Sequence, residues 1–139
     1  MIRLAAVAAL TLALTLAACG ESKEDKAQTA VCSARADIKA QVDELKGMTV
    51  TTATLDDVRA NLRAIGDGLE EIAAAQRDLT GERKEAAQKA GQTFRSEVTE
   101  VSGELVKSIS LSDGKEQIQA ALQGLASSYQ AAFAPLDCS

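Results

Sequence analysis

Residues 55–72 read LDDVRANLRAIGDGLEEI, and aliphatic side chains recur along this stretch at alternating intervals of three and four residues. That spacing puts them on one stripe of an α-helix, in the heptad pattern of helices that pack side by side. Thr54 is the expected N-cap, whose hydroxyl would accept a hydrogen bond from the first turn, while Asp56 and Asp57 complement the positive end of the helix dipole. The stripe consists of Leu55, Val58, Leu62, Ile65, Leu69 and Ile72.

The stripe continues beyond residue 72, which leaves two arrangements for the middle of the chain. Because the register is unbroken, we expect one helix over residues 55–109, about 80 Å long at 1.5 Å per residue. The alternative is a break near Gly81, in the segment DLTGE at 78–82, which would make two helices. The register passes through Gln76, Leu79, Arg83, Ala86 and Ala90, and then shifts by steps of four to Phe94, Val98, Val101, Leu105 and Ile109.

A further helix is predicted on each side of this stretch. The first covers residues 31–46 and ends at Gly47, and MTVTTAT at 48–54 is expected to form an extended connection. The last begins within SISLSDGKEQ at 108–117, where Ser110 with Asp113, or Asp113 with Glu116, would form a capping box, and it stops before Pro135. The expected buried positions are Val31, Ile38, Val42 and Leu45 in the first helix, and Leu111, Ile118, Leu122, Leu125, Tyr129 and Phe133 or Ala132 in the last.

The composition indicates an all-α protein. Aromatic residues make up 2% of the 139 residues and there is one proline, whereas Ala, Leu, Glu, Lys, Gln and Arg are abundant, which favours helices over sheets. The preferred architecture is a coiled-coil-like rod, a long antiparallel helical hairpin whose terminal helices fold back along the central helix. The alternative is a four-helix bundle. The formal net charge is −5 and no basic stripe is present, which argues against a nucleic-acid partner.

The N-terminal stretch MIRLAAVAALTLALTLAAC has the layout of an export signal. Arg3 gives a positive start, residues 4–16 are apolar, and two small residues precede Cys19. The apolar run is shorter than the roughly 20 residues of a membrane-spanning helix. The tetrapeptide Leu16-Ala17-Ala18-Cys19 resembles the lipobox of bacterial lipoproteins. This resemblance implies cleavage before Cys19 and a diacylglycerol on its sulfur, with an ordinary secretory signal as the alternative.

The lipobox resemblance also implies a location and a domain organisation. Two or more acyl chains anchor a protein stably, so we expect the mature chain at the extracytoplasmic face of a cell membrane. Gly20 stands where an aspartate is associated with inner-membrane retention, so the outer membrane is compatible in a cell that has two. Residues 1–18 would be the removed signal peptide, the polar residues 19–30 a flexible charged tether, and residues 31–138 a single helical domain.

The other two cysteines, Cys32 and Cys138, lie near the two ends of the mature chain. An exported protein leaves the reducing cytoplasm, and two leftover cysteines in a small extracytoplasmic domain usually pair. We therefore expect a Cys32–Cys138 disulfide, with two free thiols as the alternative. The spacing excludes a CxxC redox motif, and without histidine the chain lacks the usual four ligands of a zinc site.

No sequence pattern predicts catalysis, a resident metal or a cofactor, so we expect a protein that is not an enzyme. The chain has no histidine to activate a nucleophile and no glycine-rich phosphate-binding loop. Glu97, Glu100 and Glu104 share a helical face that could hold a divalent cation, but a solvated acidic face is the preferred interpretation. Phe94 and Tyr129 are expected to be packing residues.

Residues 31–138 also resemble small uncharacterised lipoproteins of high-GC Gram-positive bacteria. Those proteins share a Cys-Ser-x-x-x-x start and a cysteine close to the C-terminus, which correspond here to Cys32-Ser33 through Ile38 and to Cys138. The resemblance implies a helical fold and supports the disulfide. It implies no activity.

Three functions are compatible with these features. The preferred one is a non-catalytic helical interaction module, whose heptad seam would bind an envelope protein or another copy of the chain. The second is a structural spacer, similar to heptad-rich envelope lipoproteins that link membrane to cell wall. Those often end in a lysine joined to peptidoglycan, whereas this chain ends in Leu136-Asp137-Cys138-Ser139. The third is a carrier of a small apolar or lipid ligand held in an Ala-rich interior.

Overall fold

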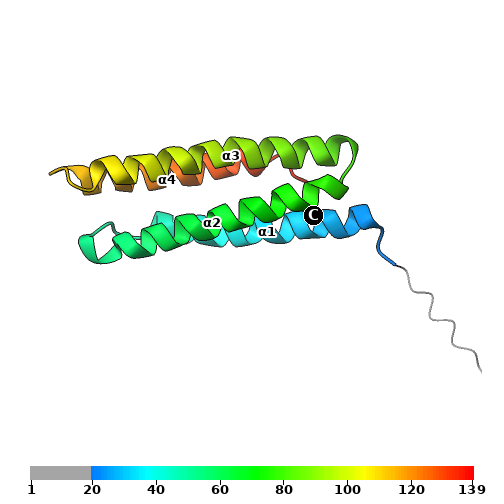
Figure 1. Ribbon diagram of the computed structural model, residues 1–139, viewed down its shortest axis with the longest axis horizontal. Coiled ribbons are helices and arrows are strands. Elements are labelled where there is room, and N and C mark those ends of the chain that lie inside the picture. Colours follow the sequence, from blue (N-terminus) through cyan, green and yellow to red (C-terminus); the bar gives the residue numbers. More distant parts are fainter. Residues whose placement is uncertain (1–19) are drawn as a thin grey trace, which may run out of the picture.

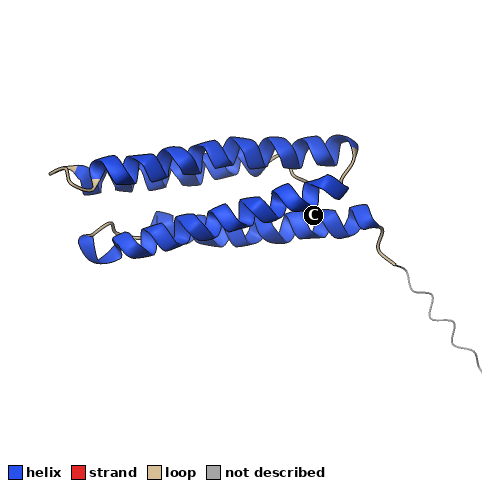
Figure 2. Cartoon of the chain, viewed as in Figure 1, coloured by secondary structure: helices blue, strands red, loops and turns tan. Residues whose placement is uncertain are grey.

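The computed structural model describes residues 20–139, which form four antiparallel α-helices (Figure 1). These residues contain no β-strand (Figure 2), so the all-α prediction is confirmed. The first two helices pack most extensively on each other, as do the last two, and the two pairs enclose the core. The elements are α1 (Lys23–Gly47), η1 (Thr52–Thr54), α2 (Leu55–Ala75), η2 (Gln76–Asp78), α3 (Gly81–Ser108) and α4 (Gly114–Phe133), where η denotes a 3₁₀ turn.

The single helix preferred for residues 55–109 is wrong, and the four-helix alternative is correct. α2 ends at Ala75, the chain tightens into η2, and Leu79 adopts an extended backbone. Gly81 then has a φ of 54°, in the left-handed region that glycine occupies without strain. The apolar stripe is unbroken in the sequence because Leu79, which belongs to the turn, is buried in the core and only 1% exposed. Leu79 therefore falls in the heptad register without being helical.

α1 begins at Lys23, so the flexible tether predicted for residues 19–30 is wrong for most of its length. The Ser22 hydroxyl caps the helix by accepting a hydrogen bond from the Asp25 backbone N–H at 3.0 Å. Ala27 continues the buried stripe toward the N-terminus, and this small side chain carried too little hydrophobic signal to be recognised. Ahead of α1, the structure describes only residues 20–22. The predicted signal peptide and Cys19 lie outside the described residues.

An aromatic cluster forms the centre of the core, as predicted for packing residues. The ring centroids of Phe94 and Tyr129 lie 5.6 Å apart, and those of Phe94 and Phe133 lie 5.4 Å apart, both in edge-to-face geometry. These contacts join α3 to α4, while the Tyr129 hydroxyl donates a 2.9 Å hydrogen bond to the Arg35 carbonyl of α1. The cluster therefore connects three of the four helices.

The connection between α1 and α2 is fastened to α4. Gln119 of α4 donates from its side chain to the Met48 carbonyl at 3.0 Å and accepts from the Val50 N–H at 2.9 Å. Val50 is buried, which explains why an isolated β-branched run can serve as a connection. The Thr54 hydroxyl donates to the Thr49 carbonyl and does not cap α2, so the predicted N-cap hydrogen bond is absent from this connection.

The turn between α3 and α4 also differs from its prediction. Neither capping box forms, and the predicted core residues Ile109 and Leu111 are 41% and 50% exposed. Ser108 closes the turn instead: its hydroxyl is fully buried and lies within 3.0 Å of carboxylate and amide oxygens from Glu104 and Gln117. Periodicity missed this because a buried serine interrupts the apolar stripe.

Gly114 makes the closest backbone approach in this turn, and replacing it with Ala is expected to disrupt the turn. A β-carbon at position 114 would lie 1.6 Å from the Ser108 carbonyl oxygen, so the backbone must move. We expect a loss of about 1 to 3 kcal/mol in the free energy of unfolding, as for other overpacked sites. Chemical denaturation measures it, and Gly103→Ala, on open surface of the same hairpin, is the control. Equal stabilities of the two variants would contradict the prediction.

Tyr129 makes stability depend on pH in the alkaline range. Burial raises the pKa of Tyr129 above its ordinary value of 10.0, so the native state holds the phenolic proton more tightly than the unfolded state does. The contribution of the protonated Tyr129 to the free energy of unfolding is constant below pH 10, and it is lost as the pH rises toward the native pKa. Unfolding of the wild type should therefore become easier above pH 10, and Tyr129→Phe should remove that part of the slope. Parallel slopes for both proteins between pH 9 and 11 (about one unit either side of the ordinary value) would rule this out.

Candidate interaction surface

Cys32 and Cys138 form a disulfide, as predicted, with their Cα atoms 5.5 Å apart. Neighbouring contacts hold the C-terminal segment on α1: Arg35 donates to the Leu136 carbonyl at 3.2 Å, and Gln28 donates to the Asp137 carbonyl at 2.6 Å. The bond therefore joins the first half of α1 to the residues that follow α4. It has a structural role at the end of the bundle where α1 begins.

The N-terminal turn of α1 contacts the connection between α2 and α3. Lys23 pairs with Asp78 at 2.9 Å, and Glu24 accepts a 3.0 Å hydrogen bond from the Thr80 hydroxyl. Asp25 lies 3.4 Å from Arg83 in the first turn of α3. The hydrogen bond to Asp78 and the charge of its carboxylate raise the pKa of Lys23 above its ordinary value. The chain thus emerges beside the α2–α3 connection, close to the end of both helices.

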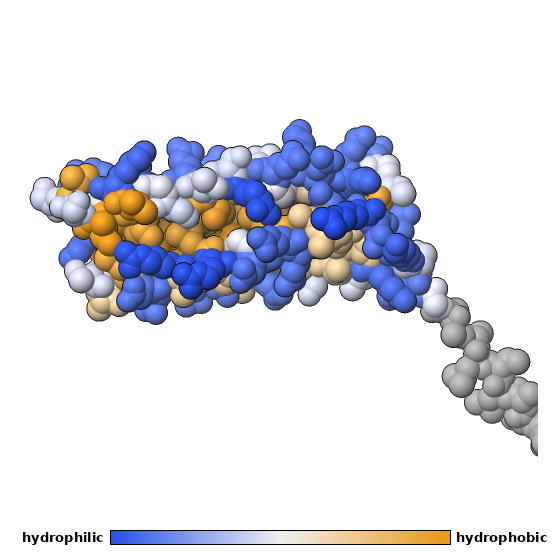
Figure 3. Space-filling model, viewed as in Figure 1, coloured by the Kyte–Doolittle hydropathy of each residue, from blue (hydrophilic) through white to orange (hydrophobic). Residues whose placement is uncertain are grey.

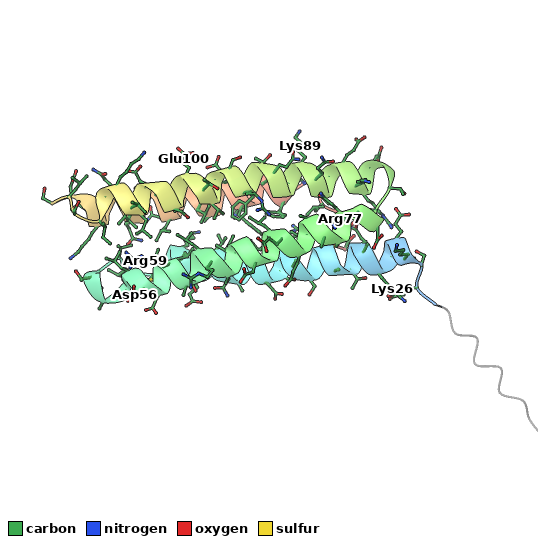
Figure 4. All side chains as sticks on the ribbon, viewed as in Figure 1. Lys26, Asp56, Arg59, Arg77, Lys89 and Glu100 are labelled. Atoms are coloured by element: carbon green, nitrogen blue, oxygen red, sulfur yellow. A yellow bond between two sulfur atoms is a disulfide. The ribbon has the colours of Figure 1, made fainter. Side chains whose placement is uncertain are left out.

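The acidic residues of α3 do not form a metal centre in the described part of the chain, residues 20–139. Glu104 is engaged by the Ser108 hydroxyl, and Glu100 projects outward from α3 (Figure 4). Glu97, Glu100 and Glu104 all border an open depression between α3 and α4. This arrangement is that of a partly solvated acidic helix face.

A groove of about 260 Å³ runs between α3 and α4 beside this acidic face. Small side chains of both helices leave it open, because alanine fills less of the space between two helices than larger residues do. Its volume is below the range of roughly 300 to 1,000 Å³ typical of small-molecule sites. The groove is lined by Ala86, Lys89, Ala90, Thr93, Glu97, Ser128, Ala131, Ala132 and Pro135.

The heptad seam that the sequence assigned to a partner is used inside the molecule. Leu55, Val58 and Ile65 are typical of it: each is buried against the other helices. A partner must therefore bind another surface.

A cluster of exposed large apolar side chains offers such a surface at the opposite end of the bundle from the disulfide. Val106, Ile109 and Leu111 are 76%, 41% and 50% exposed, and we call them the distal patch. Figure 3 shows hydrophobic residues gathered at this end, continuing between α3 and α2. The sequence pattern does not reveal the patch, because it places Ile109 and Leu111 in the core and gives Val106 no role.

Helix geometry defines which residues share the side of the molecule seen in Figure 3. A β-carbon at Gly91 would lie 3.7 Å from Ile72, so this side of α3 faces α2, and Gly68 marks the opposite edge of α2 because its β-carbon would meet Ile38 of α1. Residues at helical spacing from these positions form what we call the α2–α3 face. Its exposed members include Arg59 and Glu70 of α2 and Lys84, Arg95, Val106 and Ile109 of α3. The core residues Leu55, Leu62 and Val98, on the same side of their helices, are at most 9% exposed.

The charged members of the α2–α3 face are mainly basic. Arg59, Lys84 and Arg95 stand against Glu70 and against Asp56, the ion-pair partner of Arg59, although the whole chain carries a net charge of −5. Arg59 makes an exposed ion pair with Asp56 at 2.8 Å, beside the apolar end of the face (Figure 4). Such surface pairs contribute little and exchange partners readily. The face therefore combines a protruding apolar end with cationic side chains along its length.

The comparisons with known proteins found no relative from which the role of these residues could be inferred. No protein-family model matches the chain, and neither a curated protein nor a solved structure matches it. Within residues 20–139, no helix is both long and apolar enough to cross a membrane. Any functional conclusion must rest on the N-terminal sequence, the disulfide and the surface of the bundle.

Proposed function

We propose that this protein is an extracytoplasmic lipoprotein, anchored to a membrane by lipid on Cys19. The observation that carries the proposal is the Leu16-Ala17-Ala18-Cys19 motif at the end of an apolar run that starts after Arg3. The Cys32–Cys138 disulfide supports export, because such bonds persist in oxidising compartments. Acylation of Cys19 would leave an even pair of cysteines for that bond.

The anchored domain acts by contact and not by catalysis. Its ionisable groups are distributed over the surface of a bundle whose centre is an apolar aromatic cluster, which supports a binding role over an acid–base one. The distal patch supports a surface contact, since exposed apolar clusters mark interaction sites. The spacer and apolar-carrier functions rank lower. For the carrier, the groove between α3 and α4 holds only about 260 Å³, and the depressions of about 320 and 400 Å³ elsewhere are shallow and lined mainly by polar residues.

Intact mass of the membrane-extracted protein tests the anchoring. We expect the mass of residues 19–139 plus a diacylglycerol thioether, with a small increase on reduction as the disulfide opens. Cys19→Ala is expected to abolish both acylation and processing. Cys32→Ser, which leaves the lipobox unchanged, is the matched control and should remain acylated. Wild-type protein that lacks acyl mass, or a Cys19→Ala variant that retains it, would overturn the proposal.

A further inference from the structure

We propose that the α2–α3 face lies along an anionic lipid surface, with the distal patch inserted among the headgroups. This inference names the contact made by the proposed interaction module and rests on the proposed anchoring at Cys19. The membrane would then hold the bundle at both ends, leaving the α1–α4 side free.

The shape of the distal patch favours a lipid surface over a second copy of the chain. Val106 and Leu111 protrude, being 76% and 50% exposed, and side chains that protrude in this way can enter the interfacial layer of a membrane. Three partly exposed side chains fall well short of the roughly 800 Å² per partner that a stable protein–protein interface buries. A membrane needs no such area because the lipid anchor supplies most of the attachment.

The path of the chain places the start of α1 and the distal patch at opposite ends of the bundle. Lys23 and Asp25 contact Asp78 and Arg83, so α1 starts beside the α2–α3 connection. Only residues 20–22 separate Cys19 from α1, which holds the bundle close to the lipid. The 28 residues of α3 then lead to the patch, about 42 Å away at 1.5 Å per residue. With one end anchored, contact at the other becomes an intramolecular step with a high effective concentration.

The charge of the face selects the kind of lipid. Arg59, Lys84 and Arg95 line the α2–α3 face, with Glu70 and Asp56 as the opposing charges. Basic side chains are attracted to anionic leaflets and bind phosphate oxygens through their N–H groups. The Arg59–Asp56 pair is exposed, so Arg59 can exchange its carboxylate for a lipid phosphate. On the other side of α3, Glu97 and Glu104 would be repelled by the same surface.

Single tryptophans test this orientation cleanly, since the chain contains no Trp. The full-length protein with Val106→Trp is reconstituted into vesicles of phosphatidylcholine with phosphatidylglycerol, after intact mass has established its acylation. With vesicles present, we expect the indole at position 106 to emit at a shorter wavelength than in the same buffer without vesicles. Its fluorescence should be quenched little by iodide in the water and strongly by brominated lipid in the membrane. Gln123→Trp, exposed on α4, is the matched control and should remain accessible to iodide.

The charge arm uses Arg59→Gln combined with Arg95→Gln in the Val106→Trp background. With this variant, we expect iodide to quench the indole at position 106 much more strongly than in the Val106→Trp protein. The same increase is expected for the Val106→Trp protein on vesicles of phosphatidylcholine alone. An acylated protein whose indoles at 106 and 123 are equally accessible would overturn the inference and leave the anchoring intact. Shielding of position 106 that rises with protein concentration without lipid would instead indicate a second copy and would also overturn it. Absence of acylation would overturn both proposals.

Discussion

Replacing Phe94 with Ala is expected to lower the free energy of unfolding by about 3 to 5 kcal/mol, as typical for removing a buried aromatic ring. Phe94 is fully buried, and its ring contacts Tyr129 and Phe133 edge-to-face. The chain has only three aromatic residues, and all three are in this cluster, so no other ring can move in to fill the cavity. The free energy of unfolding of a typical domain is only about 5 to 15 kcal/mol, so this loss would be a large share of it.

Urea denaturation followed by helical circular dichroism measures the effect of Phe94→Ala. Thr99→Ala on the same helix is the control, because Thr99 is exposed and its hydroxyl bonds only to the Arg95 carbonyl of its own helix. The control is expected to stay within about 0.5 kcal/mol of the wild type. A Phe94→Ala variant as stable as the control would mean that the aromatic cluster does not organise the core.

Removing the disulfide with Cys32→Ser and Cys138→Ser is expected to cost about 2 to 5 kcal/mol. The bond spans 106 residues of sequence, so it restricts nearly the whole unfolded chain, and the chain-entropy model assigns about 4.7 kcal/mol to a loop near this length. In the native state, Gln28 and Arg35 still hold the C-terminal segment by hydrogen bonds, so the fold should persist in the variant. The loss should therefore come mainly from a less restricted unfolded state.

A reductant separates this effect from local damage. Wild-type protein with reductant should unfold at nearly the same urea concentration as the double variant, and the double variant should not respond to reductant. Cys32→Ser alone should match the double variant, because one cysteine cannot close the loop. Unchanged stability of the wild type after complete reduction would contradict the prediction.

Local patterns predicted the helices better than they predicted the helix ends. Ile65 and Leu69 are buried as their 3.6-residue period requires, because that period reports which side of a helix must leave water. Ser22 and Ala27 show where this reasoning fails: a serine cap and a small buried residue extend α1 without adding to the apolar stripe. Gly81 was recognised as a candidate break, but a buried Leu79 preserved the register and concealed it.

The candidate surface was less predictable than the fold. Ile109 and Leu111 continue an apolar pattern, and a pattern alone cannot reveal that the helices end before these side chains find partners. The basic character of the α2–α3 face is likewise invisible in a chain with net charge −5. It emerges only when α2 and α3 pack together and Arg59 of one helix shares a face with Arg95 of the other.

The sequence by itself determined the helical class, the packing role of the aromatic residues and the pairing of Cys32 with Cys138, and it supplies the lipobox-like motif on which the anchoring proposal rests. Composition and the spacing of apolar residues predict helices because helix formation depends on local chemistry. The positions of the cysteines predict a disulfide because pairing is expected in an oxidising compartment. Tertiary structure decided the break at Gly81, the early start of α1 and the exposure of Val106. Each of these depends on whether a side chain has a neighbour from a distant helix, and hydrophobic burial is a property of the packed bundle that no single stretch of chain contains.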